Sequence, residues 1–273
     1  MFQSSPRPHK LFQNIWQDFT RGKQTIGQLC IKYSRSPHWI VNALQKASIS
    51  KIKHTPCEII LILDATYWKR GNGILVARAS NLKKILAIKS ITHETTFDYW
   101  DLFLEIKLFG YDVIGVVTDG KRGVRDLFHF LPYQFCQFHQ VAIVGRLLTK
   151  KPKLIASIEF KLIMNKLTNS TQLDFEQEIT NWYTKWETFL GERTYSNDGK
   201  HYTRTHKNIW SAYRSVKFNL PYLFTYQKYP SLKIPNTSNA LDGYFSHLKD
   251  KLRNHRGLRN TMRMKIVNEL IIY

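Results

Sequence analysis

Acidic residues are scarce in this chain. Its 273 residues include 20 Asp and Glu against 41 Lys and Arg, which leaves a formal net charge of +21. An excess of this size is typical of proteins that bind a polyanion, either nucleic acid or an acidic membrane surface. Nucleic acid is the stronger expectation of the two.

Cysteine is also rare, and long apolar runs are missing. Cys30, Cys57 and Cys136 are an odd number spread over three segments, which argues against a disulfide framework and fits a reducing compartment. No stretch of about 18 apolar residues occurs, and the basic start is not followed by the apolar run of a signal peptide. We therefore expect a soluble cytoplasmic protein with no membrane partner.

Residues 1–53 form a basic segment, with nine Lys and Arg against one acid. Within it, Thr25 and Gln28 have the spacing of a capping box and predict a helix over Thr25–Tyr33. A preceding helix is expected near Leu11–Phe19. The segment is therefore predicted to be a small helical module.

A further helix is predicted after Ser36, which can cap it, with Pro37 at its first position. Three short helices with a tight turn are the layout of a helix-turn-helix, although an ordinary helical hairpin has the same pattern. The local positive charge favours DNA binding. The exposed side of this helix is then expected to contact DNA through His38, Trp39, Asn42 and Gln45.

From Glu58 the pattern changes to that of strands. Ile59–Leu63 is a continuous apolar run, typical of a strand buried on both faces, and it is predicted to end at Asp64. Gly71-Asn72-Gly73 predicts a hairpin, followed by strands over Ile74–Ala79 and Ile85–Thr92.

Alternating helices and strands are predicted up to residue 149, which gives the order βββαβαβ and then a helix for residues 58–149. The predicted elements are a helix over Phe97–Phe109, a strand over Val113–Val117 ending at Asp119, a helix over Lys121–Phe130, a strand over Tyr133–Phe138 carrying Cys136, and a helix over His139–Thr149.

Residues 150–230 are predicted to be all helical, with a loop at Tyr195–Gly199 and with Trp182, Trp186 and Trp210 as large apolar anchors. In residues 231–273, a capping cluster at Asn236–Asn239 precedes an amphipathic helix. Its apolar stripe consists of Leu241, Phe245, Leu248 and Leu252.

Asp64 and Asp119 stand where two buried strands are predicted to end, and ligands bind at the carboxyl ends of strands in open α/β sheets. Asp242 lies beside the apolar stripe of the later helix, so a third carboxylate can face the sheet. Clustered carboxylates repel one another unless they hold divalent cations such as Mg²⁺ or Mn²⁺, which serve phosphodiester chemistry. The plain alternative is two turn residues and a solvated helix face.

Four segments, in the order LILDATYW, VVTDGKRG, CQFHQ and TSNALDGYFSHLKDKLRNHRGL, resemble the Mutator-like transposases of bacterial insertion sequences. The resemblance covers most of residues 58–260. It implies an RNase H-like catalytic domain with metal-binding catalytic acids at Asp64, Asp119 and Asp242, and residues 150–230 as an insertion. Relatives usually have Glu where Asp242 stands. Many also have a cysteine-rich zinc ribbon ahead of the helix-turn-helix, which this chain lacks.

The resemblance also includes a Cys-x-x-His pair at Cys136 and His139. The pair alone does not make a zinc site, because a structural site needs about four ligands. His139 could orient a carboxylate or contact a phosphate, and a buried thiol beside a helix-capping histidine is an equally good interpretation.

Several cations surround the acids in the sequence and are candidates for contacts with the DNA backbone. They are Lys121, Arg122, Lys249, Arg253, His255 and Arg256.

These observations predict a DNA transposase that cuts and joins DNA at the ends of its element, working as a homo-oligomer on DNA near the bacterial nucleoid. Two alternatives stay open: a non-catalytic DNA-binding copy, and an RNase H-like nuclease that does not join.

Overall fold

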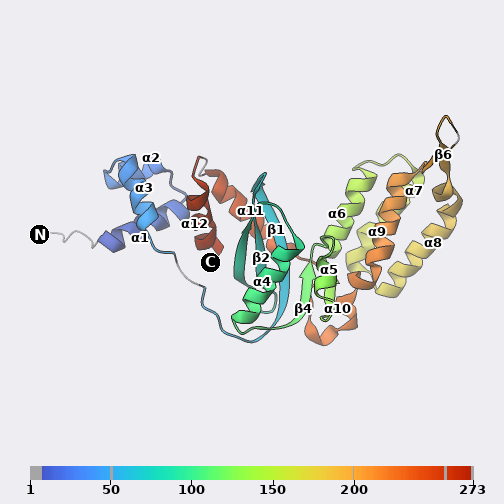
Figure 1. The fold of residues 1–273 in the computed structure, drawn as a ribbon, viewed down its shortest axis with the longest axis horizontal. Coiled ribbons are helices and arrows are strands. Elements are labelled where there is room, and N and C mark those ends of the chain that lie inside the picture. Colours follow the sequence, from blue (N-terminus) through green and yellow to red (C-terminus); the bar gives the residue numbers. More distant parts are fainter. Residues whose placement is uncertain (1–7, 50–51, 199, 255–256, 272–273) are drawn as a thin grey trace, which may run out of the picture.

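The computed structural model describes residues 8–49, 52–198, 200–254 and 257–271. A mixed five-stranded sheet lies at the centre, three short helices lie beyond one side, and a group of longer helices extends from the other (Figure 1). The chain is thus an α/β protein. Within these described ranges, no helix is both long and apolar enough to cross a membrane.

The N-terminal helices begin where the sequence predicts. The capping box of Thr25 and Gln28 starts α2, and Ser36 accepts a hydrogen bond from the backbone N–H of Trp39 at the start of α3. Their apolar faces bury Ile15 and Leu44, among others, in a shared core. The bounds are Pro8–Thr20 for α1, Ile26–Tyr33 for α2 and Pro37–Lys46 for α3.

The sheet has the strand order β3-β2-β1-β4-β5, in which β1 is antiparallel to β2 and parallel to β4. The predicted order of three strands, helix, strand, helix and strand is confirmed. The strands are β1 (Glu58–Lys69), β2 (Asn72–Ala79), β3 (Lys84–Ile91), β4 (Asp112–Thr118) and β5 (Tyr133–Phe135), and the helices between and after them are α4 (Thr96–Leu108), α5 (Val124–Leu127) and α6 (Gln137–Leu148).

Both faces of the sheet are buried, which explains the unbroken apolar run in β1. Ile59, Leu61 and Leu63 point to the side covered by α4. Ile60 and Ile62 point to the opposite side, covered by α11 (Asn239–Asn254) and α12 (Asn260–Ile271). The predicted stripe of α11 is buried there, as expected.

The helices between α6 and α11 pack around large apolar side chains. Trp182 is buried and donates a hydrogen bond from its indole N–H to the carbonyl of Ala156 (3.0 Å), while Trp186 and Trp210 are partly buried against the same core. These anchors were predicted. The elements are α7 (Ile155–Lys166), a 3₁₀ turn (Leu167–Asn169), α8 (Gln172–Gly191), α9 (Lys207–Leu223), α10 (Thr225–Lys228) and a second 3₁₀ turn (Pro230–Leu232).

This region is not all helical, which corrects the prediction for residues 150–230. An antiparallel hairpin, formed by β6 (Arg193–Tyr195) and β7 (Tyr202–Arg204), stands where only a loop was expected. Thr194, Tyr195, Tyr202 and Thr203 favour strands, but nearly all of the hairpin is exposed. It therefore lacks the alternation of apolar and polar residues by which strands are found in a sequence.

Three other element bounds differ from the prediction. β1 continues past Asp64 to Lys69 because Ala65, Thr66 and Tyr67 pair with β2. The helix predicted over Lys121–Phe130 shrinks to α5, since Gly120 and Gly123 both have positive φ. Cys136 lies just after β5 as the N-cap of α6, so it is not a strand residue.

Lys265 of α12 joins the N-terminal helices to the rest of the chain. Its ammonium group lies 2.7, 2.8 and 2.5 Å from the carbonyl oxygens of Leu44, Gln45 and Ala47, and it stands 4.8 Å from the ring centroid of Trp16. A cation at these otherwise unpaired carbonyls complements the C-terminal end of α3.

We predict that Lys265→Met lowers the free energy of unfolding by about 1–3 kcal/mol, because it removes charged hydrogen bonds to partly buried carbonyls. Lys46→Met is the matched control: Lys46 is exposed at the end of α3, the helix whose last carbonyls Lys265 contacts, and its substitution should change stability by less than about 0.5 kcal/mol. Urea denaturation measures both, and equal effects would contradict the role given to Lys265.

Candidate active site

Asp64 lies inside β1 rather than after it, which corrects the expected position. It pairs with Val76 of β2, whereas the parallel pairing of β1 with β4 ends one residue earlier, at Leu63 and Thr118. Asp64 therefore marks the carboxyl end of the parallel part of the sheet, the location where ligands bind in α/β sheets. Its side chain is only 3% exposed.

Asp119 directly follows β4, as predicted. Its Oδ1 atom accepts a hydrogen bond from the backbone N–H of Lys121 (3.2 Å) and lies 3.2 Å from the hydroxyl of Tyr99. The turn depends on Gly120, which has φ +82°, and a Cβ atom there would stand 1.7 Å from the ring of Phe135. The carboxylate of Asp119 is thus held by a tight, specific turn.

Glu94 is a further carboxylate, next to Asp119, and the sequence prediction missed it. The Tyr99 hydroxyl lies 2.7 Å from Glu94 Oε1 as well as near Asp119, so its single proton is shared between the two acids. Burial and then the charge of Asp119 raise the pKa of Glu94. Only its place soon after the predicted strand Ile85–Thr92 could have indicated it.

Asp242 lies in the first turn of α11, and the segment before this helix reaches the core of the site. Ser238 is fully buried, and its hydroxyl donates a hydrogen bond to Asp64 Oδ2 (3.1 Å). The Oδ2 atom of Asp242 is buried and has no hydrogen-bond partner among the described residues. An unpaired buried carboxylate oxygen is costly unless a cation or a ligand completes it.

The charges of the three predicted acids act on one another although they come from distant parts of the chain. The pKa of Asp64 is raised to about 7, chiefly by burial and then by the charges of Asp119 and Asp242, against the opposing effects of His139 and Ser238. The fold therefore gathers Asp64, Asp119 and Asp242 into one electrostatic neighbourhood.

Cys136 and His139 border the same neighbourhood. The buried Cys136 Sγ accepts a hydrogen bond from the backbone N–H of Ser238 (3.2 Å), and it lies 3.4 Å from the Ser238 hydroxyl, whose single proton is shared between this sulfur and Asp64. Burial would raise the pKa of Cys136, but His139 and Ser238 outweigh it and lower that pKa. For His139, burial lowers the pKa, whereas Cys136 and Asp64 raise it to about 9. Cys136 is thus linked to Asp64 through Ser238, whereas His139 acts on Asp64 through its charge.

The donor set can be tested against a divalent cation. Within the described residues, no three His, Cys, Asp or Glu side chains already stand close enough together to hold a metal ion. The residue types are nevertheless those that a divalent cation prefers: they are three carboxylates, and the buried Oδ2 atom of Asp242 has no hydrogen-bond partner among the described residues. His139 supplies one positive charge that acts on Asp64. Asp64, Asp119 and Asp242 would be the ligands.

A cationic and aromatic cavity of about 330 Å³ lies beyond the first turns of α11. Lys249 and Arg253, both predicted to contact DNA, line it with Tyr67 and Trp68 of β1. Leu252, from the predicted apolar stripe, also lines it, together with Lys69 and Arg263, which were not singled out in the sequence.

The other predicted DNA contacts lie apart from this cavity. Lys121 is partly exposed near Glu94, and its charge opposes part of the rise in the pKa of Glu94. Arg122 is exposed. His255 and Arg256 lie outside the described residues.

The predicted DNA-reading side of α3 differs in one residue. His38 and Gln45 are exposed and Asn42 is half-buried, whereas Trp39 packs edge-on against Phe12, with ring centroids 6.0 Å apart. Trp39 is therefore partly buried, because the short helices need its apolar surface for their core. The other three side chains line a cavity of about 500 Å³ together with residues 257–259 and α12.

No protein-family model and no curated protein matches this chain.

The raised pKa of Asp64 predicts a pH dependence of stability without metal. Folded Asp64 holds its proton up to about pH 7, whereas the ordinary value is 3.8, so the stability it contributes at low pH is lost as pH rises between these values. The amide in the Asp64→Asn variant cannot ionise, so this variant should not lose stability in this way as pH rises. In the parent, the loss in the free energy of unfolding is at most about 1.4 kcal/mol per pH unit.

Chemical denaturation in EDTA across this pH range measures the effect. Asp64→Asn should gain stability over the parent as pH rises, whereas the exposed Asp250→Asn on α11 should follow the parent. Parallel curves for the parent and Asp64→Asn would contradict the buried, proton-holding carboxyl.

Proposed function

We propose that this chain is a DNA transposase with an RNase H-like catalytic domain and a helix-turn-helix reader, which cuts and joins DNA with divalent metal. The observation that carries the proposal is that the charges of Asp119 and Asp242 both act on the buried carboxyl of Asp64, although the three acids are separated by 55 and 123 residues in the sequence. Such carboxylate groups suit phosphodiester chemistry.

The fold supports this class of enzyme. Three antiparallel strands followed by two parallel ones, with the third acid on a helix that packs against the first strand, agree with the RNase H-like arrangement that the resemblance to Mutator-like transposases implies. The three N-terminal helices, with Ser36 capping the last, agree with a helix-turn-helix. His38, Asn42 and Gln45 would then contact DNA bases.

Asp64, Asp119 and Asp242 would hold Mg²⁺ or Mn²⁺, which when bound lowers the pKa of a water or hydroxyl nucleophile and stabilises charge on the phosphate. The chain's own side chains orient these ligands. Ser238 fixes Asp64, Tyr99 and the Lys121 N–H fix Asp119, and the seating of α11 on the sheet fixes Asp242. Oriented ligands are a requirement of metal sites that act on phosphate.

DNA would lie along the cations next to these acids. Lys249, Arg253 and Arg263 present charge beside the rings of Tyr67 and Trp68, so a phosphate backbone and an unstacked base both find a partner. The excess of +21 supports a long contact with a polyanion.

The acids are tested by substitution on DNA that includes the sequences flanking the gene. Asp64→Asn, Asp119→Asn and Asp242→Ala should abolish Mg²⁺-dependent cleavage while leaving affinity for DNA within about threefold, because they remove metal ligands and not phosphate contacts. Asp242→Glu should keep activity, since it retains the carboxylate and adds the reach of one methylene.

Asp250→Asn is the matched control, because Asp250 lies on the same helix but is exposed and pairs with Arg253. Cleavage and gel-shift assays on the same preparations give both readouts. An active parent whose Asp242→Ala variant cuts equally well would remove Asp242 from the site.

A further inference from the structure

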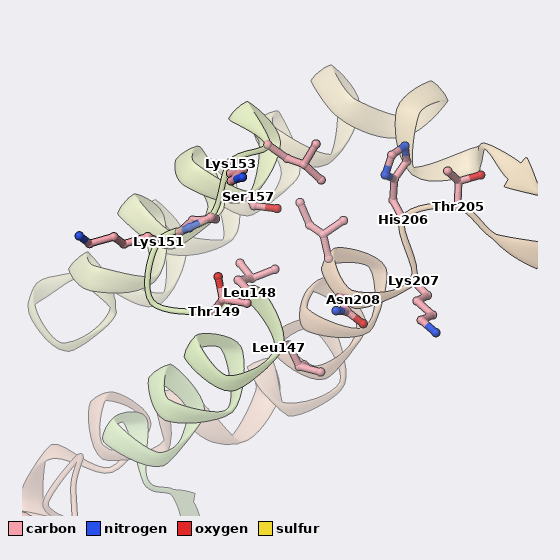
Figure 2. A pocket seen from close by; sticks show the side chains of 13 residues that line it. Leu147, Leu148, Thr149, Lys151, Lys153, Ser157, Thr205, His206, Lys207 and Asn208 are labelled. Atoms are coloured by element: carbon pink, nitrogen blue, oxygen red, sulfur yellow. The ribbon is translucent and has the colours of Figure 1, made fainter.

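We propose that a second site, in the helical region far from the acids, binds a phosphate group. It is a cavity of about 430 Å³ where the end of α6 meets the first turns of α7 and α9 (Figure 2). That the phosphate belongs to DNA rests on the proposed function, whereas the binding of a phosphate group at this cavity does not.

Two helices present unpaired N–H groups to this cavity. Neither α7 nor α9 has a side-chain cap, and their first hydrogen bonds begin at the N–H groups of Ile158 and Trp210. The backbone N–H groups of residues 155–157 and 207–209 consequently have no partner among the described residues. Residues of both first turns line the cavity, and helix N-termini attract anions.

Ser157 supplies independent support for a ligand. Its side chain is 4% exposed, lines the cavity and makes no hydrogen bond to any described residue. Figure 2 shows its hydroxyl directed into the space between the three segments. The side chain is thus mostly enclosed by protein, and its hydroxyl opens only to the cavity, where a phosphate oxygen can accept its proton.

The charge around the cavity is positive. Lys151, Lys153 and Lys207 belong to the lining, and none pairs with a carboxylate among the described residues. The ammonium groups of Lys151 and Lys207 point away from the cavity in Figure 2, so they stand at its rim. The backbone carbonyls just after α6 would repel an anion, but they already accept hydrogen bonds from the ammonium group of Lys161, at 3.2 Å for Thr149 and 2.7 Å for Lys150.

The apolar part of the lining limits the kind of ligand. Leu147, Leu148, Leu154 and Ile209 cover one part of the cavity, so a bare anion would leave them in contact with water. A phosphate that belongs to a nucleotide, in a DNA backbone or free, would place its sugar or base there.

The test compares Ser157→Asp with Ile158→Asp in full-length protein with EDTA present. Ser157→Asp places a carboxylate at the unpaired N–H groups, which suits the start of α7 and should not unfold it, and this carboxylate repels phosphate. Ile158→Asp adds the same charge to the same helix, but at an exposed residue outside the cavity lining.

Two measurements are made on each protein. One is the rise in melting temperature with inorganic phosphate at constant ionic strength. The other is the affinity for a short DNA duplex at several salt concentrations.

Phosphate should stabilise the parent and Ile158→Asp more than Ser157→Asp. If the ligand is DNA, Ser157→Asp should also bind the duplex about tenfold more weakly, with a salt slope smaller by about one. Loss of phosphate stabilisation with unchanged DNA affinity would support the same site with a free phosphate or nucleotide as its ligand.

Equal phosphate stabilisation of Ser157→Asp and Ile158→Asp, or none in the parent, would overturn the proposal. EDTA prevents metal-dependent cleavage in these assays, so the phosphate site is tested whether or not the chain cuts DNA. A parent that phosphate stabilises here, but that does not cut DNA in a separate assay with Mg²⁺, would contradict the transposase proposal and leave this site standing.

Discussion

The burial of the Asp64 carboxyl is the constraint on which the rest of the site depends. A carboxylate inside a sheet loses its hydration, so it must be protonated or be given partners. The backbone N–H of Ala65 (2.8 Å) and the hydroxyl of Ser238 (3.1 Å) are those partners. Since Ser238 also binds Cys136, this one buried group ties together β1, the start of α6 and the start of α11.

A second buried network explains how a long helical region can interrupt the site without displacing it. The side-chain amides of Gln134 and Gln137 both donate to the carbonyl of Leu223 at 2.9 Å, and the Thr225 hydroxyl donates to the carbonyl of Tyr133 (2.6 Å). The end of α9 is therefore fastened to β5. From there the chain returns to Asn236, which pairs with Gln137 and delivers Ser238 to Asp64.

Much of this arrangement is predictable from sequence because its signals are local. The apolar runs of β1 and β4, the capping box at Thr25 and the stripe of α11 each depend on residues a few positions apart. Asp119 follows its strand for the same reason, and the spacing of the apolar stripe placed Asp242 on the helix that packs against the sheet.

What could not be predicted depends on residues that meet only in the fold. β1 extends past Asp64 because β2 pairs with it, and Glu94 joins the acids because Tyr99 reaches both it and Asp119. The hairpin of β6 and β7 is too exposed to produce an apolar pattern. Trp39 is drawn into the core of the N-terminal helices by Phe12, a contact that helical spacing alone does not reveal.

The central claim is that the gathered acids cut and join DNA. The most direct measurement incubates the purified chain and Mg²⁺ with DNA that contains the flanks of its gene and with a target plasmid, and then sequences the products. We expect junctions between the 3′ ends of the flanking DNA and the target that require both Mg²⁺ and Asp64. DNA that is bound but never cut, or cut but never joined, would contradict the claim.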